Sequence, residues 1–281
     1  MLVLADAHVH VYPTYDATRV FNTGIENLES LRIQLIEGGS KRAEAEDSHV
    51  KVFFLTERFD CHFFRELADQ GSDRLDGSFQ VENAAEPAAL SLLRNGTAVA
   101  YLFAGRQIVT RERVEILALA TDSEIPDGLS VRESIEAIRT ESGIPVVNWA
   151  PGKWFFQRGK IVASLLAHQT PRTLLLGDTT LRPVGWAEPR LMRQGREHGF
   201  KVVAGSDPLP FEGEEQWVGR YGIAVQGSFD PRMPTTSIRE MLLSDISPIT
   251  PVGRRCSVRQ VADRLRKNQS VRRSHERDRQ P

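Results

Sequence analysis

The start of the chain carries a carboxylate and two imidazoles, each separated from the next by one residue. Asp6, His8 and His10 follow the apolar run Leu2–Leu4. In a β-strand alternate side chains face the same way, so this spacing predicts that the three polar groups converge at the end of a strand while the residues between them point into the packing. Neutral imidazole and carboxylate are common ligands of divalent metals. The alternative is an HxH pair that simply packs at a strand end.

Carboxylates near other apolar runs extend this candidate site. Glu57 and Asp207 each follow an apolar run, and Glu115 stands at the start of another. We expect His8, His10, Glu115 and Asp207 to be the ligands of one divalent ion. Nitrogen and carboxylate ligands fit zinc, manganese or iron. Asp207 or Glu57 would accept a proton from a metal-activated water. For Glu115 the alternative is a carboxylate at a strand edge with no role in the site.

Three basic residues follow predicted strands and are candidates for substrate binding. Lys153, Arg158 and Arg182 lie shortly after the apolar runs that end near residues 147 and 176. Together they could form a cationic rim that receives an anionic group such as phosphate. The alternative is that each is a solvated loop charge or an ion-pair partner of Asp178. The expected partner is therefore an anionic small molecule.

The elements that must position these residues alternate between strand and helix. Periodicity predicts helices over 24–36, 61–68, 161–167 and 189–198, and strands over 50–55, 144–147, 173–176 and 201–204. Ser130 and Glu133 form a capping-box pattern that predicts a further helix. Strands at 78–82, 98–103 and 114–119, with a turn at 104–107, indicate antiparallel pairing in the middle of the chain. The pattern predicts an α/β fold, a distorted TIM-like (β/α) barrel with some antiparallel strands in the middle. An open doubly wound sheet is the alternative, although no Gly-rich dinucleotide motif follows the first strand.

Taken in order, these motifs resemble those of the polymerase and histidinol phosphatase (PHP) superfamily of metal-dependent hydrolases, and more distantly the amidohydrolases. The resemblance covers roughly residues 1–210. It rests on Asp6-Ala7-His8-Val9-His10, on Ala150-Pro151-Gly152 where that superfamily carries His-Pro-Gly, and on Gly205-Ser206-Asp207 where it carries Gly-Ser-Asp-x-His. It implies a distorted β/α barrel with a cluster of divalent metals that activates water for phosphoester hydrolysis.

Three ligands expected from this resemblance are replaced. Thr56-Glu57-Arg58 stands where the superfamily usually has Thr-Asp-His, Ala150 replaces the histidine of His-Pro-Gly, and Leu209 replaces the last histidine. Arginine is a permanent cation that repels a metal beside it. The remaining ligands are enough for one metal ion, and not for a cluster.

Two functions are therefore compatible with the sequence. The first is a PHP-like metal-dependent hydrolase that acts on a phosphoester or another anionic small molecule. The second is a catalytically degenerate PHP-like barrel that serves as a ligand-binding or scaffold protein. We favour the hydrolase because Asp6, His8, His10 and Asp207 all remain, whereas a barrel without a metal need not keep polar residues at strand ends.

Composition predicts one large domain and a basic C-terminal extension. The chain has 281 residues, 40% of them hydrophobic, which is enough for one full core. From residue 253 onward ten Arg and Lys face three acidic residues, so this part carries +7 and the rest −8. We expect a single barrel domain over 1–252 and a basic helix with a flexible tail over 253–281, solvated from about Lys267. A nucleic-acid or membrane-surface arm is the alternative for this tail.

Location and remaining partners follow from simple features. Cys61 and Cys256 lie far apart without metal-site spacing, which favours a reducing, cytoplasmic setting. No apolar stretch approaches the roughly 20 residues needed to cross a bilayer. We therefore expect a soluble protein without a membrane partner, and we do not expect nucleic acid as a partner.

Overall fold

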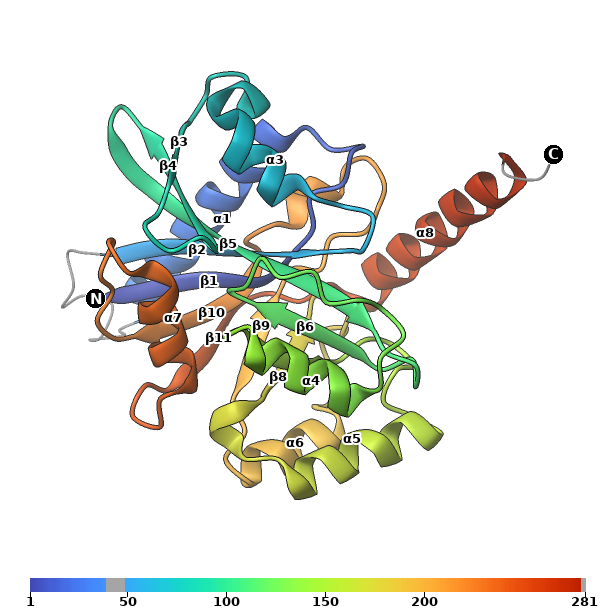
Figure 1. The fold of residues 1–281 in the computed structure, drawn as a ribbon. Helices are drawn as coiled ribbons and strands as arrows, with labels where there is room; N and C mark the ends of the chain where they lie inside the picture. The colour runs from blue at the N-terminus through green and yellow to red at the C-terminus, as the bar shows by residue number, and fades with distance from the viewer. Residues whose placement is uncertain (39–48, 279–281) are drawn as a thin grey trace.

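A computed structural model describes residues 1–38 and 49–278 and shows a mixed α/β fold built around a nearly closed barrel (Figure 1). The strand order is β11-β10-β1-β2-β5-β6-β7-β8-β9, and β3 and β4 extend the sheet beside β5. The strands are β1 (Leu2–Val9), β2 (His49–Glu57), β3 (Gln80–Asn83), β4 (Ala89–Arg94), β5 (Thr97–Val109), β6 (Glu115–Leu119), β7 (Ile144–Asn148), β8 (Leu175–Thr179), β9 (Val202–Gly205), β10 (Tyr221–Gln226) and β11 (Ile249–Gly253). The helices are α1 (Ala17–Glu37), α3 (Phe63–Gln70), α4 (Val131–Thr140), α5 (Phe156–His168), α6 (Arg190–Glu197), α7 (Pro234–Leu243) and α8 (Val258–Asp278), with short 3-10 helices η1 (Gly71–Leu75), η2 (Pro171–Thr173) and η3 (Glu214–Trp217).

The directions of the strands confirm the predicted fold class. β1, β2 and β5 pair in parallel, as do β7, β8 and β9. Between these groups β6 runs antiparallel to both β5 and β7, and β10 runs antiparallel to β1. The barrel is therefore distorted by antiparallel strands in its middle, as the sequence predicts.

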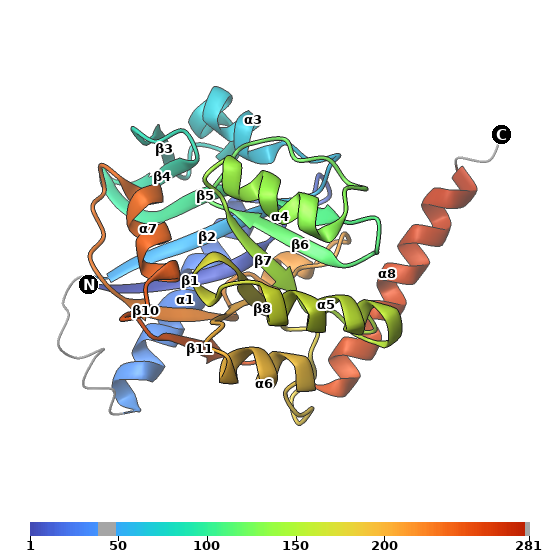
Figure 2. The same cartoon turned by 60° about the horizontal axis from the view of Figure 1, so that its bottom comes forward.

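The barrel interior is apolar and is closed at one end by α7. Alternate residues of the strands, among them Val3 and Phe54, form one buried cluster that also contains Ile238 of α7. Lys201, just before β9, donates to the carbonyl of Leu242 in α7 at 3.3 Å. Figure 2 shows α7 near the start of β1. The opposite end, where the parallel strands finish, remains available for polar side chains.

Helices cover the outer face of the barrel in two groups. α1 and α3 pack against β1, β2 and β5 in a cluster that includes the Phe21–Phe53 ring contact. α4, α5 and α6 pack against β6, β7 and β8 through residues such as Ile135 and Val162. The capping box of Ser130 and Glu133 is present at the start of α4, as predicted.

Several elements differ from the sequence prediction. The turn predicted at 104–107 is wrong, because β5 continues without interruption to Val109. Gly105 looks like a turn residue but lies inside the sheet, where a Cβ would stand 2.5 Å from the carbonyl oxygen of Ala118 in β6. Strands β4, β10 and β11 and helix α7 were not expected. The predicted stop at Gly38-Gly39 agrees with the end of α1 at Glu37, although Gly39 lies outside the described residues.

The C-terminal helix is longer than the sequence predicts. α8 continues to Asp278 as one helix, so the chain does not leave helical structure near Lys267. Both views show its distal part extending away from the barrel (Figures 1 and 2). Cys61 and Cys256 are both free. None of the helices within residues 1–38 and 49–278 is both long and apolar enough to span a membrane.

Candidate metal centre

A β-bulge in β1 turns the two histidines toward the barrel axis. Leu4 packs in the outer cluster under α1, and regular alternation would place residues 8 and 10 on that same face. The pairing of β1 with β2 instead shifts register between Asp6 and Val9, and Val9 joins Leu4 in the outer cluster. A bulge reverses the facing of the residues beyond it. His8 and His10 therefore face inward, which corrects the expectation of a regular strand with three polar groups on one face.

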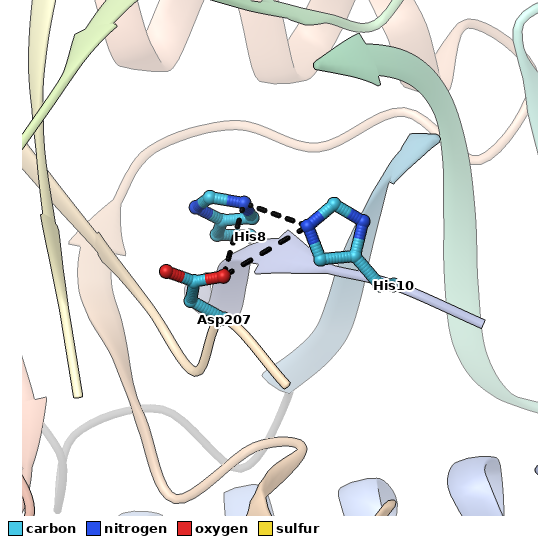
Figure 3. Close-up of side chains that lie close together, drawn as sticks. All are labelled: His8, His10 and Asp207. Atoms are coloured by element: carbon cyan, nitrogen blue, oxygen red, sulfur yellow. Dashed lines mark hydrogen bonds and ion pairs between the residues drawn. The ribbon is translucent and has the colours of Figure 1, made fainter. Parts of the chain in front are cut away.

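Three potential ligand atoms meet at the rim of the barrel (Figure 3). Nε2 of His8 lies 3.0 Å from Nε2 of His10. Oδ1 of Asp207 lies 3.6 Å from Nε2 of His8 and 3.9 Å from Nε2 of His10. All three residues are buried. In the part of the chain that the structure describes, no second group of His, Cys, Asp and Glu has an arrangement able to hold an ion.

The geometry and charge of this group fit one divalent ion. Metal bonds of about 2 Å place neighbouring ligand atoms roughly 3–3.5 Å apart. The distance between the two Nε2 atoms of His8 and His10 matches this range. The distances from Oδ1 of Asp207 to these two atoms are slightly longer. Burial, together with the His8 ring, holds the pKa of His10 well below its usual value, so His10 offers the neutral imidazole that binds metals. Nδ1 of His8 is buried without a partner among the described residues, so this histidine lacks the outer hydrogen bond that usually orients a metal ligand.

Asp6 organises the backbone of the site and does not join the ligand group. Its carboxylate accepts the N–H groups of His8 at 3.1 Å, Ser206 at 2.9 Å and Gly219 at 2.8 Å. Burial raises the pKa of Asp6 to about 6, and these hydrogen bonds oppose the rise. Asp6 therefore ties the end of β1 to the end of β9 and to the start of β10.

Contacts on both sides hold Asp207 in a left-handed conformation. Its φ is +48°, which is uncommon for a residue other than glycine and recurs at functional sites. Its N–H donates to the carbonyl of His8 at 2.9 Å, and its carbonyl accepts from Nη2 of Arg264 at 3.0 Å. The buried guanidinium of Arg264 is paired with Glu214, and Glu214 also accepts the N–H of Leu209. An ion pair that includes α8 therefore braces the turn that carries Asp207.

Glu115 lies beside the three-residue group and outside it. Because β6 is antiparallel to β7, its first residue pairs with Asn148 at the rim, and Nδ2 of Asn148 donates to Oε1 of Glu115 at 2.5 Å. Burial and then the charge of Asp207 raise the pKa of Glu115, while His8 and Lys153 oppose the rise. The charges of the site thus shift the pKa of this carboxylate, but Glu115 is not one of the three convergent ligands.

Glu57 accepts a hydrogen bond from the first turn of α3. Its Oε1 accepts the N–H of Phe64 at 2.7 Å, which satisfies a donor in the first helical turn. Burial raises the pKa of Glu57 to about 7, and the Phe64 bond and the charge of Arg106 oppose the rise. Glu57 also lines a small cavity with His62 and Arg65. Glu57 is not one of the three convergent ligands, and its expected role as a proton acceptor stays a prediction.

The three predicted substrate-binding cations differ in how far they are committed to other partners. Arg182 donates two hydrogen bonds to the Asp178 carboxylate at 2.8 and 2.5 Å, so its charge is already compensated, as the ion-pair alternative described. Arg158, in the first turn of α5, donates to the carbonyl of Gly152 in the preceding turn at 2.7 Å. Lys153 is half-buried and acts on Glu115. Of the three, Lys153 is the cation whose charge acts on Glu115.

Sequence reasoning missed two residues at or next to the site, Gln107 and Arg264. Oε1 of Gln107 lies 3.0 Å from Nε2 of His8. Arg58, which the sequence already marked as a cation in place of a histidine, acts on His10 and lowers its pKa. Arg264 reaches the site from the C-terminal helix. Continuing the alternation of β5 past Gly105 would have identified Gln107. No local pattern could identify Arg264, because 57 residues separate it from Asp207.

Comparisons with known proteins identify the fold. Neither the protein-family models nor the curated proteins give a match to this sequence. Among solved structures, PsfC from Pseudomonas syringae PB-5123 is similar with a TM-score of 0.55 and 12% sequence identity, over 97% of this chain and 98% of that chain. At this identity the similarity concerns the fold alone.

Weaker similarities include a two-domain protein from Bacteroides vulgatus ATCC 8482 that contains a predicted PHP-like metal-dependent phosphoesterase. Its TM-score is 0.46 at 12% identity, over 89% of this chain and 65% of that chain. The lesion-specific endonuclease PfuEndoQ from Pyrococcus furiosus gives 0.49 at 12% identity, over 89% and 58%. Endonuclease Q in complex with a 27-mer duplex substrate is also similar, with a TM-score of 0.46 at 10% identity, over 89% and 58%. A PHP-like protein thus occurs among the similar structures. The expectation that nucleic acid is not a partner stays a prediction.

Proposed function

We propose that this protein is a metal-dependent hydrolase that acts on a phosphoester or another anionic small molecule. The observation that carries the proposal is the meeting of His8, His10 and Asp207 at the rim of the barrel where the parallel strands end. The PHP-like motifs add the reaction class. A bound divalent ion would supply a Lewis acid and an activated water at this rim.

Each residue of the site has a proposed role. His8, His10 and Asp207 hold the ion, and Glu115 is a candidate further ligand because it lies within electrostatic reach of His8 and Asp207. Asp207 is also the proton acceptor, since Glu57 is occupied at α3. Lys153 binds the anionic group of the substrate, because its charge acts at the site and no ion pair holds it among the described residues.

Metal content and turnover test this proposal together. We expect protein purified without added metal to contain about one zinc, manganese or iron ion per chain by elemental analysis. A chelator should abolish hydrolysis of a phosphoester panel, and metal should restore it. Absence of stoichiometric metal, combined with no hydrolysis after metal loading, would contradict the proposal.

A non-catalytic barrel is the second candidate function, and one set of observations favours it. Ala150 and Leu209 cannot bind a metal, and the Arg58 cation acts directly on His10. A protein of this kind would bind an anionic ligand at the rim without turning it over. Stoichiometric metal with no hydrolysis across the panel would favour this function.

A further inference from the structure

We infer that the protein has a second anion-binding site, for a phosphoryl group, in a cavity between α1, the end of β11 and the start of α8. None of the residues that line this cavity belongs to the group of His8, His10 and Asp207. The inference therefore holds whether or not the barrel is a hydrolase.

The size and lining of the cavity suit a small anionic molecule. It has a volume of about 480 Å³, within the usual range of small-molecule sites. Arg220, Arg254 and Arg255 line it, together with Trp217 and neutral polar side chains, and none of the lining residues is acidic. Three guanidinium groups around one cavity make its electrostatic potential positive.

The described residues do not compensate these three charges. Arg220 lies with its guanidinium carbon 4.9 Å from the centre of the Trp217 ring. In the described part of the chain, no ion pair involves Arg220, Arg254 or Arg255, although salt bridges occur at other arginines such as Arg264. Nη1 of Arg255 is buried and has no hydrogen-bond partner there. Arg255 itself is half-buried and lines the cavity, so its guanidinium charge is available to an anion bound there.

The first turn of α8 adds to the positive character of the cavity. Ser257 and Gln260 both line it, and they cap the helix reciprocally. The N–H of Ser257 donates to Oε1 of Gln260 at 2.8 Å, and the N–H of Gln260 donates to Oγ of Ser257 at 3.3 Å. α8 has 21 residues and no acidic side chain in its first turn. Its N-terminal dipole therefore reinforces the three arginines.

The three arginines favour a phosphoryl group as the ligand of this cavity. Arginine presents a planar fork of donors that matches the oxygens of phosphate, and several arginines together favour an anion with more than one charge. The cavity has room for a group larger than phosphate, and Gln34 of α1 offers a neutral hydrogen-bonding group for it. Asn27 and Ser30 already donate to backbone carbonyls. A phosphorylated small molecule fits these features.

Calorimetric titration of the full chain with inorganic pyrophosphate tests the inference. A chelator in the buffer keeps the candidate metal centre free of metal, and low salt limits screening. We expect the wild-type protein to bind pyrophosphate and the double variant Arg254→Gln/Arg255→Gln to bind at least about tenfold more weakly. Gln34→Glu places a negative charge at an exposed helical position in the lining, so it should weaken binding without a risk to folding.

A charge-matched control separates the cavity from general attraction. Arg259 and Arg266 are exposed on α8 and do not line the cavity, so Arg259→Gln/Arg266→Gln removes the same charge. This control and Asp207→Asn should each change affinity by about twofold or less. No binding by the wild type at millimolar pyrophosphate, an equal loss in the control, or undiminished binding by Gln34→Glu would overturn the inference.

Discussion

Asp207 combines a side-chain and a backbone requirement at one position. Its carboxylate faces His8 and His10, while its backbone stays at φ +48° between the end of β9 and the following loop. Asparagine and aspartate adopt this conformation more readily than other residues with a Cβ. An exchange between the two therefore changes the charge of the site while it keeps the turn.

Asp207→Asn should weaken metal binding far more than it changes stability. Loss of the charged ligand should reduce metal affinity by at least about tenfold and turnover by orders of magnitude. The free energy of unfolding of the metal-free protein should change by less than about 1 kcal/mol. Calorimetry and urea unfolding measure the two effects. Asp230→Asn, at a half-buried position after β10, is the control. Unchanged metal affinity in Asp207→Asn would remove Asp207 from the ligand set.

Glu57→Gln should change how stability depends on pH. Burial raises the pKa of Glu57 from 4.5 to about 7, so between these pH values the folded protein binds more protons than the unfolded chain. The contribution of Glu57 to the free energy of unfolding therefore falls as pH rises from 4.5 to 7, by about 3 kcal/mol. Glutamine keeps an oxygen for the N–H of Phe64 and cannot ionise.

Urea unfolding at pH 4 and pH 8 checks this pH dependence. We expect Glu57→Gln to match the wild type at pH 4 and to be more stable at pH 8. Glu240→Gln, at an exposed position of α7, should show no such difference. Equal stability of Glu57→Gln and wild type at both pH values would mean that the Glu57 carboxylate is not destabilised by burial.

At the residue scale, the sequence shows ligands that follow strands but not the residues that support them. His8, His10 and Asp207 stand out because each is a metal-binding type at the end of an apolar run. The sequence did not indicate Gln107, because Gly105 suggested a turn. Sequence alone does not distinguish a glycine between two closely packed strands from a glycine in a turn. Arg264 gave no signal because a buried ion pair between residues 50 positions apart leaves no local pattern.

At the element scale, α8 divides into a part that belongs to the site and a part that projects from it. Val261, Leu265 and Arg264 pack toward Trp217, and Arg264 lies 4.8 Å from the centre of its ring. The guanidinium also donates to the carbonyl of Asp207 and to Oγ1 of Thr180. The distal half extends away from the barrel (Figure 1). Sequence alone indicates the amphipathic start of this helix but not the site to which it docks.

Arg264→Lys should weaken metal binding, whereas removal of residues 272–281 should not. Lysine keeps the charge but cannot donate in parallel to Glu214, Thr180 and Asp207, so the Asp207 turn loses its brace. We expect a loss of about 2 kcal/mol in unfolding free energy and about tenfold in metal affinity. The truncation should leave the Tm and metal affinity unchanged. A purely structural role of Arg264 would lower stability but leave the affinity of the folded variant intact.

The strands that the sequence did not predict all pair antiparallel. β4 and β10 are mostly buried, whereas β11 is largely exposed, so its residues lack a continuous apolar pattern. The βα units gave clear signals because apolar runs alternate with helical periodicity. The general barrel was therefore predictable, whereas the strands that complete it depend on tertiary contacts.

At the scale of the whole molecule, the two ends of the barrel are sealed in different ways. At the site end β9 comes against β1, and Asp207 donates to the carbonyl of His8. At the opposite end α7 inserts apolar side chains such as Met241. A Cβ on Gly205 would lie 2.4 Å from the backbone nitrogen of His8, and a Cβ on Gly227 would lie 2.4 Å from Cγ of Met241. The same added atom thus meets rigid backbone at one end and a flexible side chain at the other.

This contrast predicts different outcomes for two equal substitutions. Gly205→Ala must push β9 away from β1, so we expect a loss of about 3 kcal/mol in unfolding free energy and of metal binding. Gly227→Ala should cost about 1 kcal/mol, because methionine adopts other rotamers easily, and should leave metal binding intact at the far end of the barrel. Urea unfolding and metal titration measure both effects. Equal losses in the two variants, or full metal affinity in Gly205→Ala, would show that the close approach of β9 to β1 does not hold His8 and Asp207 together.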